Sequence, residues 1–437
     1  MKKYLILPGN DDQNRGDQAL VWEAKRIAEE SGCIGQFYMF SNPTMSSQSV
    51  EEGIVPVNGI LLHPSRFFKD HNNIKYSKRM LVKWGFVAMF DFLYSRLLLV
   101  PGLRRLIVFL SSKRIKEAFS IMEQCDGVFV KGGGFVHANG EKTAYYRIYY
   151  MLFHILLAKK LKKRIVMLPN SFGPFDGVGV KKLVKRVVSK IDLLYSRETL
   201  SQNMLRGRLR IESYLRPDLG FYLSSEHVDI SKYLDRNKKN VALTARPYRF
   251  PGASNPDELY EKYLTDYTLF VKWLIDNGFN PVFVEHVYNI NAHERDLICI
   301  NEICKRLSNV GYSVSIISDW NFNCRHLKGV YKQFDYLVGT RFHSVIFGLS
   351  EGIPSLAITY GGNKGDGIMK DLGLTNFSVP ISSFSFEALR TAFAKLANNE
   401  QRGIDFSFIN NQRKLMVNEI KELFNENTIV NKNSAEE

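Results

Sequence analysis

The sequence Gly339-Thr340-Arg341-Phe342-His343-Ser344 follows an apolar run that ends at Val338. A second apolar run, residues 355–359, leads through Tyr360 into Gly361-Gly362-Asn363-Lys364-Gly365. Both arrangements predict a buried strand that ends in a turn, and open parallel sheets bind ligands beyond the carboxyl ends of their strands. Arginine, histidine and lysine side chains at such turns suit a small, densely anionic ligand such as a phosphate or a carboxylate.

A structural role is the alternative for these side chains. In that case Arg341 caps the helix that follows, and His343 is a hydrogen-bonded residue of the core. Ligand binding is favoured because similar strand-end glycine motifs recur along the chain.

The chain of 437 residues is long for a single hydrophobic core and predicts two domains. Short apolar runs alternate with helical patterns in both halves, which indicates parallel sheets built from βαβ units. We expect two similar α/β domains facing a cleft, at residues 1–222 and 240–400, with a linker at 217–240. Residues 401–437 are expected to form a C-terminal helix and a polar tail, and the helical pattern at 408–425 to pack back on the first domain.

The expected strands of the first domain are 3–8, 36–40, 126–131, 164–169 and 192–196. Those of the second domain are 240–245, 281–286, 313–317, 335–339 and 354–359. Helices are expected between them, among them one at residues 292–308.

Residues 60–119 interrupt the alternation and carry most of the net charge. They hold twelve Lys and Arg against Asp70, Asp91 and Glu117, a balance of +9 within the formal net charge of +15 for the chain. Basic residues alternate there with apolar clusters such as 84–90, a pattern typical of a helix that lies in a membrane surface. A helical insert packed on the domain is the alternative, and a contact with a second copy of the chain stays open. Charge confined to one segment, without a recognition module, argues against nucleic-acid binding.

Five scattered cysteines without a CxxC pair support neither a zinc ribbon nor a disulfide framework, and they fit a reducing cytosol. The apolar run at residues 4–7 is too short for a signal peptide and predicts a first strand. We find no stretch of about 18 uncharged apolar residues, which a spanning helix would need. We therefore expect a cytoplasmic protein that at most attaches peripherally to the inner face of the membrane.

Further strand ends carry glycines, arginines or small polar residues. Asn14-Arg15-Gly16-Asp17 opens a helix whose N-terminus favours anions, although Asp17 would also suit an N-cap. Lys131-Gly132-Gly133-Gly134 forms a backbone concavity for a sugar or an anion, a tight turn being the alternative. Three more predicted strands end in polar segments, which are Pro169-Asn170-Ser171, Ser196-Arg197-Glu198 and Arg246-Pro247. Arg197, Arg246 and Arg341, if they converge on one cleft, would bind a phosphate and a carboxylate together.

Glu285-His286 and His293-Glu294-Arg295-Asp296 raise the question of a metal site. Their spacing fits neither an HExxH helix nor a His/Cys zinc pattern. The chain also lacks the Asp-x-Asp motif of metal-dependent sugar-nucleotide transferases. We therefore expect no metal.

The order of these motifs resembles that of the polysaccharide pyruvyl transferase family. The resemblance rests on Gly16-Asp17-Gln18-Ala19, Gly132-Gly133-Gly134, Ser171-Phe172-Gly173-Pro174, Ser196-Arg197-Glu198, Pro217-Asp218-Leu219, Gly339 to Ser344 with Ile346, Gly352-Ile353-Pro354, Tyr360 and Lys364. It covers nearly the whole chain except about 45–120 and the tail. The departures are a longer loop from Asp11 to Asn14 and the basic insert.

The resemblance implies two Rossmann-like domains around a cleft, similar to the architecture of GT-B glycosyltransferases. It also implies transfer of pyruvate from phosphoenolpyruvate to two hydroxyls of a hexose, which leaves a cyclic ketal and phosphate. The hexose would belong to a cell-surface polysaccharide, such as a capsule or exopolysaccharide, or to its lipid-linked precursor. Phosphoenolpyruvate is then a co-substrate, and no cofactor is required.

With that chemistry we expect His343 to act as general acid and base, because histidine titrates near neutral pH, and Arg341 beside it to bind the donor. The other expected donor contacts are Lys364, Arg246, Arg197, Thr340 and Gly362. The expected acceptor contacts are Asp17, Gly16, Gly132, Gly133, Gly134, Ser171 and His286.

Two other functions fit parts of the sequence. A glycosyltransferase of the same shape would need a base and ribose pocket for a nucleotide sugar, and no clear acidic ribose contact follows Thr359. A non-catalytic envelope-assembly protein would not need the combination of Arg341, His343 and Lys364.

Overall fold

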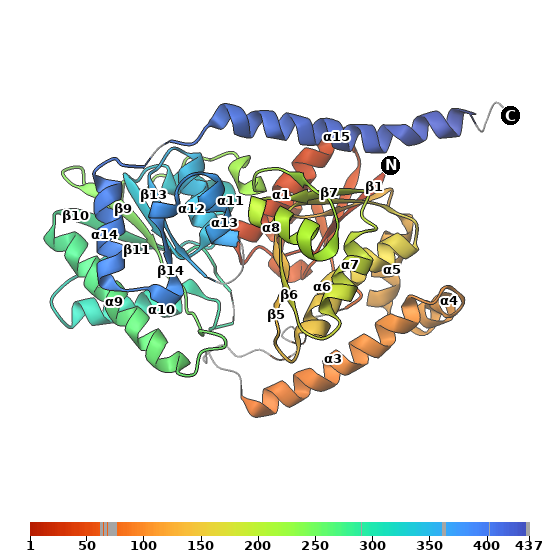
Figure 1. Ribbon diagram of the computed structural model, residues 1–437, viewed down its shortest axis with the longest axis horizontal. Helices are drawn as coiled ribbons and strands as arrows, with labels where there is room; N and C mark the ends of the chain where they lie inside the picture. Colours follow the sequence, from red (N-terminus) through yellow and green to blue (C-terminus); the bar gives the residue numbers. More distant parts are fainter. Residues whose placement is uncertain are drawn as a thin grey trace.

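Two separate parallel sheets, each flanked by helices, organise the chain (Figure 1). The computed structural model describes residues 1–61, 64, 68, 77–289, 291–360, 364–401 and 403–433, without the side chains of Lys364 and of residues 426–433. We call the part that builds the first sheet the N-terminal unit, and the part that builds the second sheet the C-terminal unit.

The N-terminal sheet has the strand order β3-β2-β1-β4-β6-β7-β8, and β5 lies off this path and pairs with β6. Its strands are β1 Lys3–Leu7, β2 Gln36–Phe40, β3 Ile54–Val57, β4 Gly127–Val130, β5 Gly133–Asn139, β6 Arg164–Asp176, β7 Leu193–Ser196 and β8 Tyr214–Leu215. Neighbouring strands are parallel, and β1 meets β4 with Leu7 opposite Val130.

The C-terminal sheet has the order β11-β10-β9-β12-β13-β14, again with parallel neighbours. Its strands are β9 Lys239–Thr244, β10 Phe279–Val284, β11 Ser315–Ile317, β12 Tyr336–Gly339, β13 Ser355–Thr359 and β14 Ser378–Pro380. In both sheets the strand order reverses beside the first strand, between β1 and β4 and between β9 and β12. Such a switch point opens a crevice at the carboxyl ends of the strands. The predicted pair of Rossmann-like domains is confirmed.

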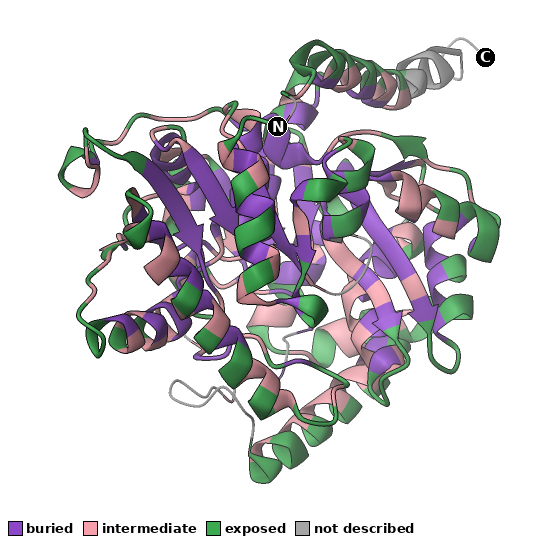
Figure 2. Cartoon of the chain, turned by 60° about the vertical axis from the view of Figure 1, so that its left-hand side comes forward, coloured by how far each residue is buried: buried purple, intermediate pink, exposed green. Residues whose placement is uncertain are grey.

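Helices cover the sheets, so central strands are apolar on both faces instead of alternating. Every residue of β4, β12 and β13 is buried. Figure 2 shows strands inside both halves of the molecule in the purple of buried residues. The helices are α1 Arg15–Glu30, α2 Ser47–Glu51, α3 Lys78–Leu98, α4 Pro101–Leu110, α5 Lys113–Gln124, α6 Ala144–Lys160, α7 Val180–Val188, α8 Thr199–Met204, α9 Pro256–Asp276, α10 Asp296–Ser308, α11 Cys324–Tyr331, α12 Phe342–Ser350, α13 Lys364–Asp371, α14 Phe386–Ala397 and α15 Phe406–Asn433.

Strand β5 is the main element that the sequence did not predict. The strand expected at 164–169 continues as β6 to Asp176, and β5 runs along it with Gly133 opposite Asn170. Gly133 therefore begins a strand instead of a simple turn. Its φ of +147° is strained for any residue with a side chain, which accounts for the glycine.

Smaller differences concern short elements and one helix end. β3, β8 and β14 have two to four residues each, too few for a recognisable periodicity. α10 begins at Asp296 and not at the predicted residue 292, because Arg295 has an extended backbone with φ −75° and ψ 121°.

Helix α15 crosses from the C-terminal unit back to the N-terminal unit (Figure 1). Arg413 Nη1 donates to Glu23 at 3.0 Å, and the ring of Phe424 stacks on Phe129 with centroids 5.7 Å apart. The C-terminal helix thus buries apolar and charged groups against the first sheet and its first helix.

Candidate active site

A cavity of about 1020 Å³ lies between the two units, and both contribute to its wall. Many of its residues lie in or just after β1, β4 and β6 of the N-terminal unit, or after β9, β10, β12 and β13 of the C-terminal unit. The carboxyl edges of both sheets therefore face it at their switch points. The wall includes Asp11, Gln13, Asp17, Lys131, Gly133, Gly134 and Ser171 from the N-terminal unit, and Tyr248, Arg249, Asn289, His293, Glu294, His343 and Tyr360 from the C-terminal unit.

The N-termini of two helices from different units meet at this cavity. α1 begins after Asn14, whose side-chain oxygen accepts from the backbone N–H of Gly16 at 3.1 Å and of Asp17 at 3.3 Å. α12 begins after Arg341 and places His343 in the wall. A Cβ added to Gly16 would lie 2.1 Å from Nδ1 of His343, so the imidazole occupies the space that a side chain would need. Two helix N-termini at one point favour an anionic ligand.

Gly16→Ala is expected to lower turnover and thermal stability together, because the new methyl group overlaps the His343 ring across the boundary between the units. Overpacking of this kind costs about 1–3 kcal/mol. Gly85→Ala is the matched control, since a Cβ there meets no heavy atom within 4 Å and alanine suits the interior of α3. Melting curves and rates of Gly16→Ala that match those of Gly85→Ala would contradict the contact.

Lys131 and Asp17 form an ion pair in the cavity wall. Lys131 Nζ donates to Asp17 Oδ1, and Asn14 Nδ2 donates to Asp17 Oδ2 at 2.7 Å. Lys131 is only 2% exposed, and the Asp17 carboxylate partly replaces the water that burial removes from its ammonium group. Asn14 caps α1, whereas Asp17 lies in its first turn and lines the cavity.

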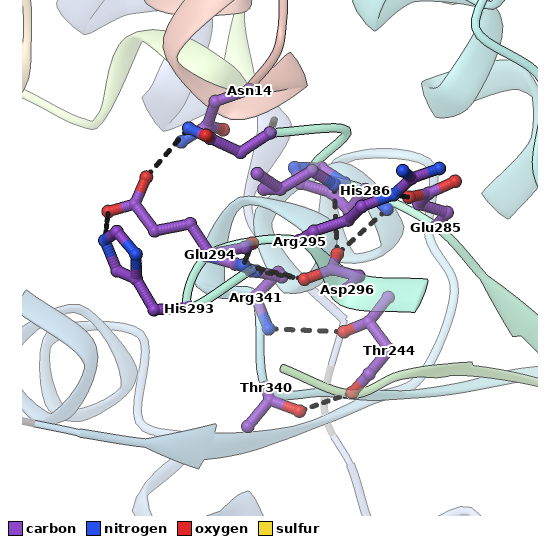
Figure 3. A network of polar contacts seen from close by, with 12 residues as sticks. Asn14, Thr244, Glu285, His286, His293, Glu294, Arg295, Asp296, Thr340 and Arg341 are labelled. Carbon is purple, nitrogen blue, oxygen red and sulfur yellow. Dashed lines mark hydrogen bonds and ion pairs between the residues drawn. The ribbon is translucent and has the colours of Figure 1, made fainter. Parts of the chain in front are cut away.

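Arg341 lies behind the wall that the described residues form, with its head group on Asp296 (Figure 3). Its Nε donates to Asp296 Oδ1 at 2.7 Å, and its Nη2 donates to the backbone carbonyl of Glu294. The other oxygen of Asp296 accepts from the backbone N–H groups of His286 and Val287 at 3.0 and 2.9 Å. Burial raises the pKa of Asp296, and the guanidinium opposes this rise. Arg341 thus fixes the loop after β10, which contributes residues to the wall.

Thr340 also holds the fold at this point. Its backbone N–H donates to the carbonyl of Thr244 at 3.1 Å, and its hydroxyl donates to the same oxygen. The backbone N–H of Arg341 donates to the hydroxyl of Thr244 at 3.2 Å. These contacts join the carboxyl ends of β9 and β12, and Figure 3 draws the two that involve a hydroxyl group.

Arg197 belongs to a second buried polar cluster, at the end of β7. Its Nε donates to Ser171 at 2.7 Å, and its Nη1 donates to Asp218 at 2.6 Å. Ser171 in turn donates to Glu198 at 2.9 Å. Burial raises the pKa of Glu198 to about 7, and Arg197 opposes the rise. Of these four side chains, Ser171 is the one in the cavity wall.

Arg246 lies behind two tyrosines of the wall. Its guanidinium carbon is 4.5 Å from the ring centroid of Tyr360 and 5.9 Å from that of Tyr248. Among the described residues its Nε is buried and has no hydrogen-bond partner. Tyr248 and Arg249, which were not predicted for the site, follow Arg246-Pro247 in the loop after β9 and line the cavity. Their position at a predicted strand end was the available signal.

The remaining predicted residues differ in their placement. Gly133 and Gly134 line the cavity, whereas a Cβ on Gly132 would meet the carbonyl oxygen of Pro169 at 2.9 Å, so Gly132 is packed against backbone. His286 is buried behind the wall, with Nδ1 3.1 Å from the hydroxyl of Tyr331. Gly362 lies outside the described residues, as does the side chain of Lys364, the first residue of α13.

His293 and Glu294, which the sequence suggested only in connection with a metal, both line the cavity. Nε2 of His293 is 3.9 Å from a carboxylate oxygen of Glu294 (Figure 3). Burial lowers the pKa of His293, and Glu294 opposes this change. The described part of the chain holds no group of three or more His, Cys, Asp or Glu arranged for a metal ion.

One part of the wall is largely aromatic and comes from the N-terminal unit. Its rings are Phe40, Trp84, Phe135 and Tyr150, interspersed with the polar side chains of Asn42, His137, Arg147 and His154. Trp84 belongs to α3, Phe135 to β5 and Tyr150 to α6. None of these residues was predicted for the site. Trp84 comes from the insert, Phe135 from an unpredicted strand and Tyr150 from the middle of a helix, whereas Phe40 ends a predicted strand without standing in a recognisable motif.

Arg15 holds the two units together beside the cavity. It is fully buried, its Nη2 donates to the carbonyl of Trp320 at 2.6 Å, and its guanidinium carbon is 4.8 Å from the ring centroids of Trp320 and Tyr288. The backbone N–H of Tyr288 donates to the carbonyl of Gln13 at 2.7 Å. These contacts set the position of the α1 N-terminus relative to the C-terminal unit.

Solved structures of other proteins have a similar fold. A putative UDP-N-acetylglucosamine 2-epimerase from Listeria monocytogenes matches with a TM-score of 0.54 at 11% identity, over 95% of this chain and 90% of that one. The UDP-GlcNAc 2-epimerase from Neisseria meningitidis, bound to UDP-GlcNAc, matches with a TM-score of 0.53 at 12% identity, over 97% and 100% of the two chains. These similarities concern the fold, and they confirm the predicted GT-B-like architecture.

Sequence comparison identifies the family. The amylovoran biosynthesis protein AmsJ of Erwinia amylovora is 22% identical over an alignment of 403 residues, and the match covers 87% of this chain and 88% of that protein. The family model described as polysaccharide pyruvyl transferase matches residues 14–362, a span that includes the wall residues of both units from Asp17 to Tyr360. The chain belongs to the polysaccharide pyruvyl transferase family.

Proposed function

We propose that this protein transfers pyruvate from phosphoenolpyruvate to two hydroxyls of one hexose, forming a cyclic ketal and releasing phosphate. The hexose belongs to a cell-surface polysaccharide or to its lipid-linked precursor. Membership of the family supports the class of reaction. The observation that supports the site most strongly is the contact of His343 with Gly16, which brings a titratable side chain of one unit against an anion-favouring helix end of the other.

The phosphate and carboxylate of the donor need cationic groups. Lys131 and Arg249 line the cavity. Arg246 lies behind Tyr360, and no described residue accepts a hydrogen bond from its Nε. A donor that displaces part of the Lys131–Asp17 contact would gain a charge-assisted hydrogen bond in a poorly solvated position. We propose these three cations as the donor-binding set.

Two residues after β13 remain proposed donor contacts, namely Gly362 and Lys364. Arg341 and Arg197 have a different proposed role, since Asp296 and Asp218 already hold their guanidinium groups. They keep the strand ends in position and thereby support donor binding without contacting the donor.

The proposed reaction balances without a redox step, a metal or another cofactor. One hydroxyl attacks the carbon that bears the phosphate while the methylene carbon takes up a proton. Phosphate then leaves, and the second hydroxyl closes the ring. Of the two hydroxyl protons, one ends on the new methyl group and the other on phosphate. Both transfers need a group that titrates near neutral pH, and we assign this role to His343.

His293 is a second candidate for accepting a hydroxyl proton. Burial lowers the pKa of its imidazole below the usual value of about 6.5, so the ring is neutral and able to accept a proton at neutral pH. It lies in the wall formed by the loop after β10, which Arg341 and Asp296 hold in place.

The aromatic part of the wall is the proposed acceptor site. Sugar rings pair apolar C–H faces with hydroxyl edges, so a site with flat rings and a few polar side chains suits them. Trp84, Phe135 and Tyr150 supply the rings, and His137 and Arg147 supply polar groups. Asp17 and Ser171 lie in the same cavity wall and are proposed to orient the hydroxyls that react.

Release of phosphate tests the function. The protein is incubated with phosphoenolpyruvate, with a synthetic or lipid-linked hexoside, or with both, and phosphate and the mass of the sugar are measured. We expect phosphate release and a mass gain of pyruvate less water only when both substrates are present. A protein that ignores phosphoenolpyruvate and instead consumes a nucleotide sugar would be a glycosyltransferase, and the proposal would fail.

A further inference from the structure

Helices α3 and α4 expose apolar side chains along their outer faces. On α3, residues Val82, Phe86, Met89, Leu93 and Leu97 repeat at intervals of three or four residues and are between 41% and 66% exposed. Phe90 lies beside them at 67%, and α4 adds Leu106, Phe109 and Leu110 at 54%, 73% and 71%. We call these residues the outer face of α3–α4. Soluble proteins normally expose apolar side chains singly, whereas here they follow one another along two helices.

The opposite side of α3 packs on the protein. Ser95 lies 2.8 Å from the hydroxyl of Tyr149 on α6, and the ring of Phe92 is 4.8 Å from that of Tyr149. Trp84 lines the cavity. A helix that is apolar all round is normally covered on all sides. The described chain covers the inner side of α3 and leaves the outer side exposed (Figures 1 and 2).

The charge around the outer face of α3–α4 has one sign. Residues 77–116 contain nine Lys and Arg and a single acidic residue, Asp91, which is half-buried. Lys78 and Arg79 at the start of α3, and Arg105 on α4, are exposed. Exposed aromatic and aliphatic residues flanked by basic residues are the pattern of a helix that lies in the interface of an anionic bilayer.

We propose that the outer face of α3–α4 docks on an anionic lipid surface, with Phe86, Phe90 and Phe109 in the headgroup region and the basic residues against lipid phosphates. No helix of the described residues is long and apolar enough to cross a bilayer, so the attachment is peripheral. The large exposed rings would leave water on docking and enter the headgroup region. The basic residues would attract the anionic lipids, and added salt would screen this attraction.

A second copy of this chain is a poorer partner for the same face. A symmetric pair brings the same surface of both subunits together. Each copy would then meet exposed basic residues of the other, and the one acidic side chain of the segment, Asp91, is half-buried instead of exposed. An anionic bilayer complements this positive charge, whereas a second copy would bring like charges together.

The proposed docking has a consequence for the substrate, which rests on the proposed function. α3 carries Trp84 in the cavity wall on one side and the apolar stripe on the other. A helix with its side chains is about 10 Å thick. A bilayer on the outer face therefore lies about one helix diameter from the proposed acceptor site, which suits a glycan still attached to its lipid.

Vesicle flotation tests the docking and needs no substrate, so it is independent of the pyruvyl transfer. The full chain is mixed with vesicles of phosphatidylcholine alone or of equimolar phosphatidylglycerol and phosphatidylcholine. We expect binding to the anionic vesicles that weakens with salt. The triple variant Phe86→Ser, Phe90→Ser, Phe109→Ser should bind at least about 100-fold more weakly, because three large rings no longer leave water. Phe408→Ser, which changes a 55% exposed ring on α15, is the matched control and should bind like the wild type.

Charge variants provide the second arm. Lys78→Ala and Arg79→Ala should each weaken binding about fivefold at low salt, while melting curves stay unchanged because both side chains are exposed. Equal binding to neutral and anionic vesicles, or failure of the folded wild type to bind either, would overturn the proposal. So would a dimer in sedimentation velocity without lipid that the triple phenylalanine variant converts to a monomer.

Discussion

His343→Gln is expected to lower turnover by about 10²–10⁴-fold and to leave the affinity for phosphoenolpyruvate largely unchanged. Glutamine keeps a polar side chain of similar length beside Gly16 but cannot take up and release a proton near neutral pH. The rate constant comes from phosphate release at saturating substrates, and the affinity comes from titration calorimetry with phosphoenolpyruvate alone. The dependence of the residual rate on pH should lose the step that His343 causes in the wild type.

A purely structural role of His343 would give a different result. The side chain is buried at the boundary of the units, so a packing role predicts that stability and turnover fall together while the pH profile keeps its shape. His227→Gln changes an exposed histidine outside the cavity wall and is the matched control. Turnover of His343→Gln equal to that of His227→Gln would remove His343 from the chemistry.

Arg341→Ala is expected to destabilise the protein by about 3–5 kcal/mol, because it leaves Asp296 buried without its cationic partner. Asp296 is fully buried, and the two backbone N–H groups that it still accepts from offset only part of the loss. Chemical denaturation measures the change. Arg341→Ala combined with Asp296→Ala should be less destabilised than the sum of the single changes, since the unpaired charge is then gone.

An exposed ion pair provides the comparison for Arg341. Nη2 of Arg206 is 2.7 Å from Oε2 of Glu212, and both side chains are largely solvent-accessible. Arg206→Ala should therefore leave the denaturation midpoint unchanged. If Arg341→Ala instead kept the wild-type stability and lost phosphoenolpyruvate binding, its guanidinium would contact the donor. In that case the pairing with Asp296 would describe only the state without substrate.

The strands that frame both switch points could be predicted from the sequence because they are short apolar runs with a clear boundary. Each run ends at glycine, arginine or a small polar residue, so the motifs at Asp17, Gly133 and His343 were expected at the carboxyl edges. The same rule applied to Arg249 and His293, which follow predicted strands by a few residues. Arg249 stands in no recognisable motif, and the motif that contains His293 suggested only a metal site.

The contacts of the buried arginines could not be predicted, because each partner lies far away in the chain. Arg341 pairs with Asp296, 45 residues earlier, and Arg197 pairs with Asp218, 21 residues later. A sequence shows that an arginine ends a strand, but it does not show whether an acidic residue from another loop reaches it. The structure supplies that partner, and we propose on this basis that both arginines support the site.

The aromatic part of the cavity was unpredictable for a related reason. Trp84, Phe135 and Tyr150 come from a helix of the insert, an irregular edge strand and the middle of a long helix. In the sequence they belong to ordinary apolar patterns that predict only packing. Their convergence depends on the path of β5 along β6, which the glycines at 132–134 and the sequence Gly173-Pro174 concealed.

An isotope label in phosphoenolpyruvate shows most directly whether the protein forms a pyruvate ketal on a hexose and whether His343 is needed for it. The protein is incubated in heavy water with a hexoside and phosphoenolpyruvate labelled with ¹³C at the carbon that bears the phosphate, and the sugar product is examined by NMR. The account predicts a labelled ketal carbon bonded to two oxygens of the same hexose, with one deuterium in the adjacent methyl group, and no such product with His343→Gln. A sugar without the label, or a labelled product whose formation does not depend on His343, would contradict it.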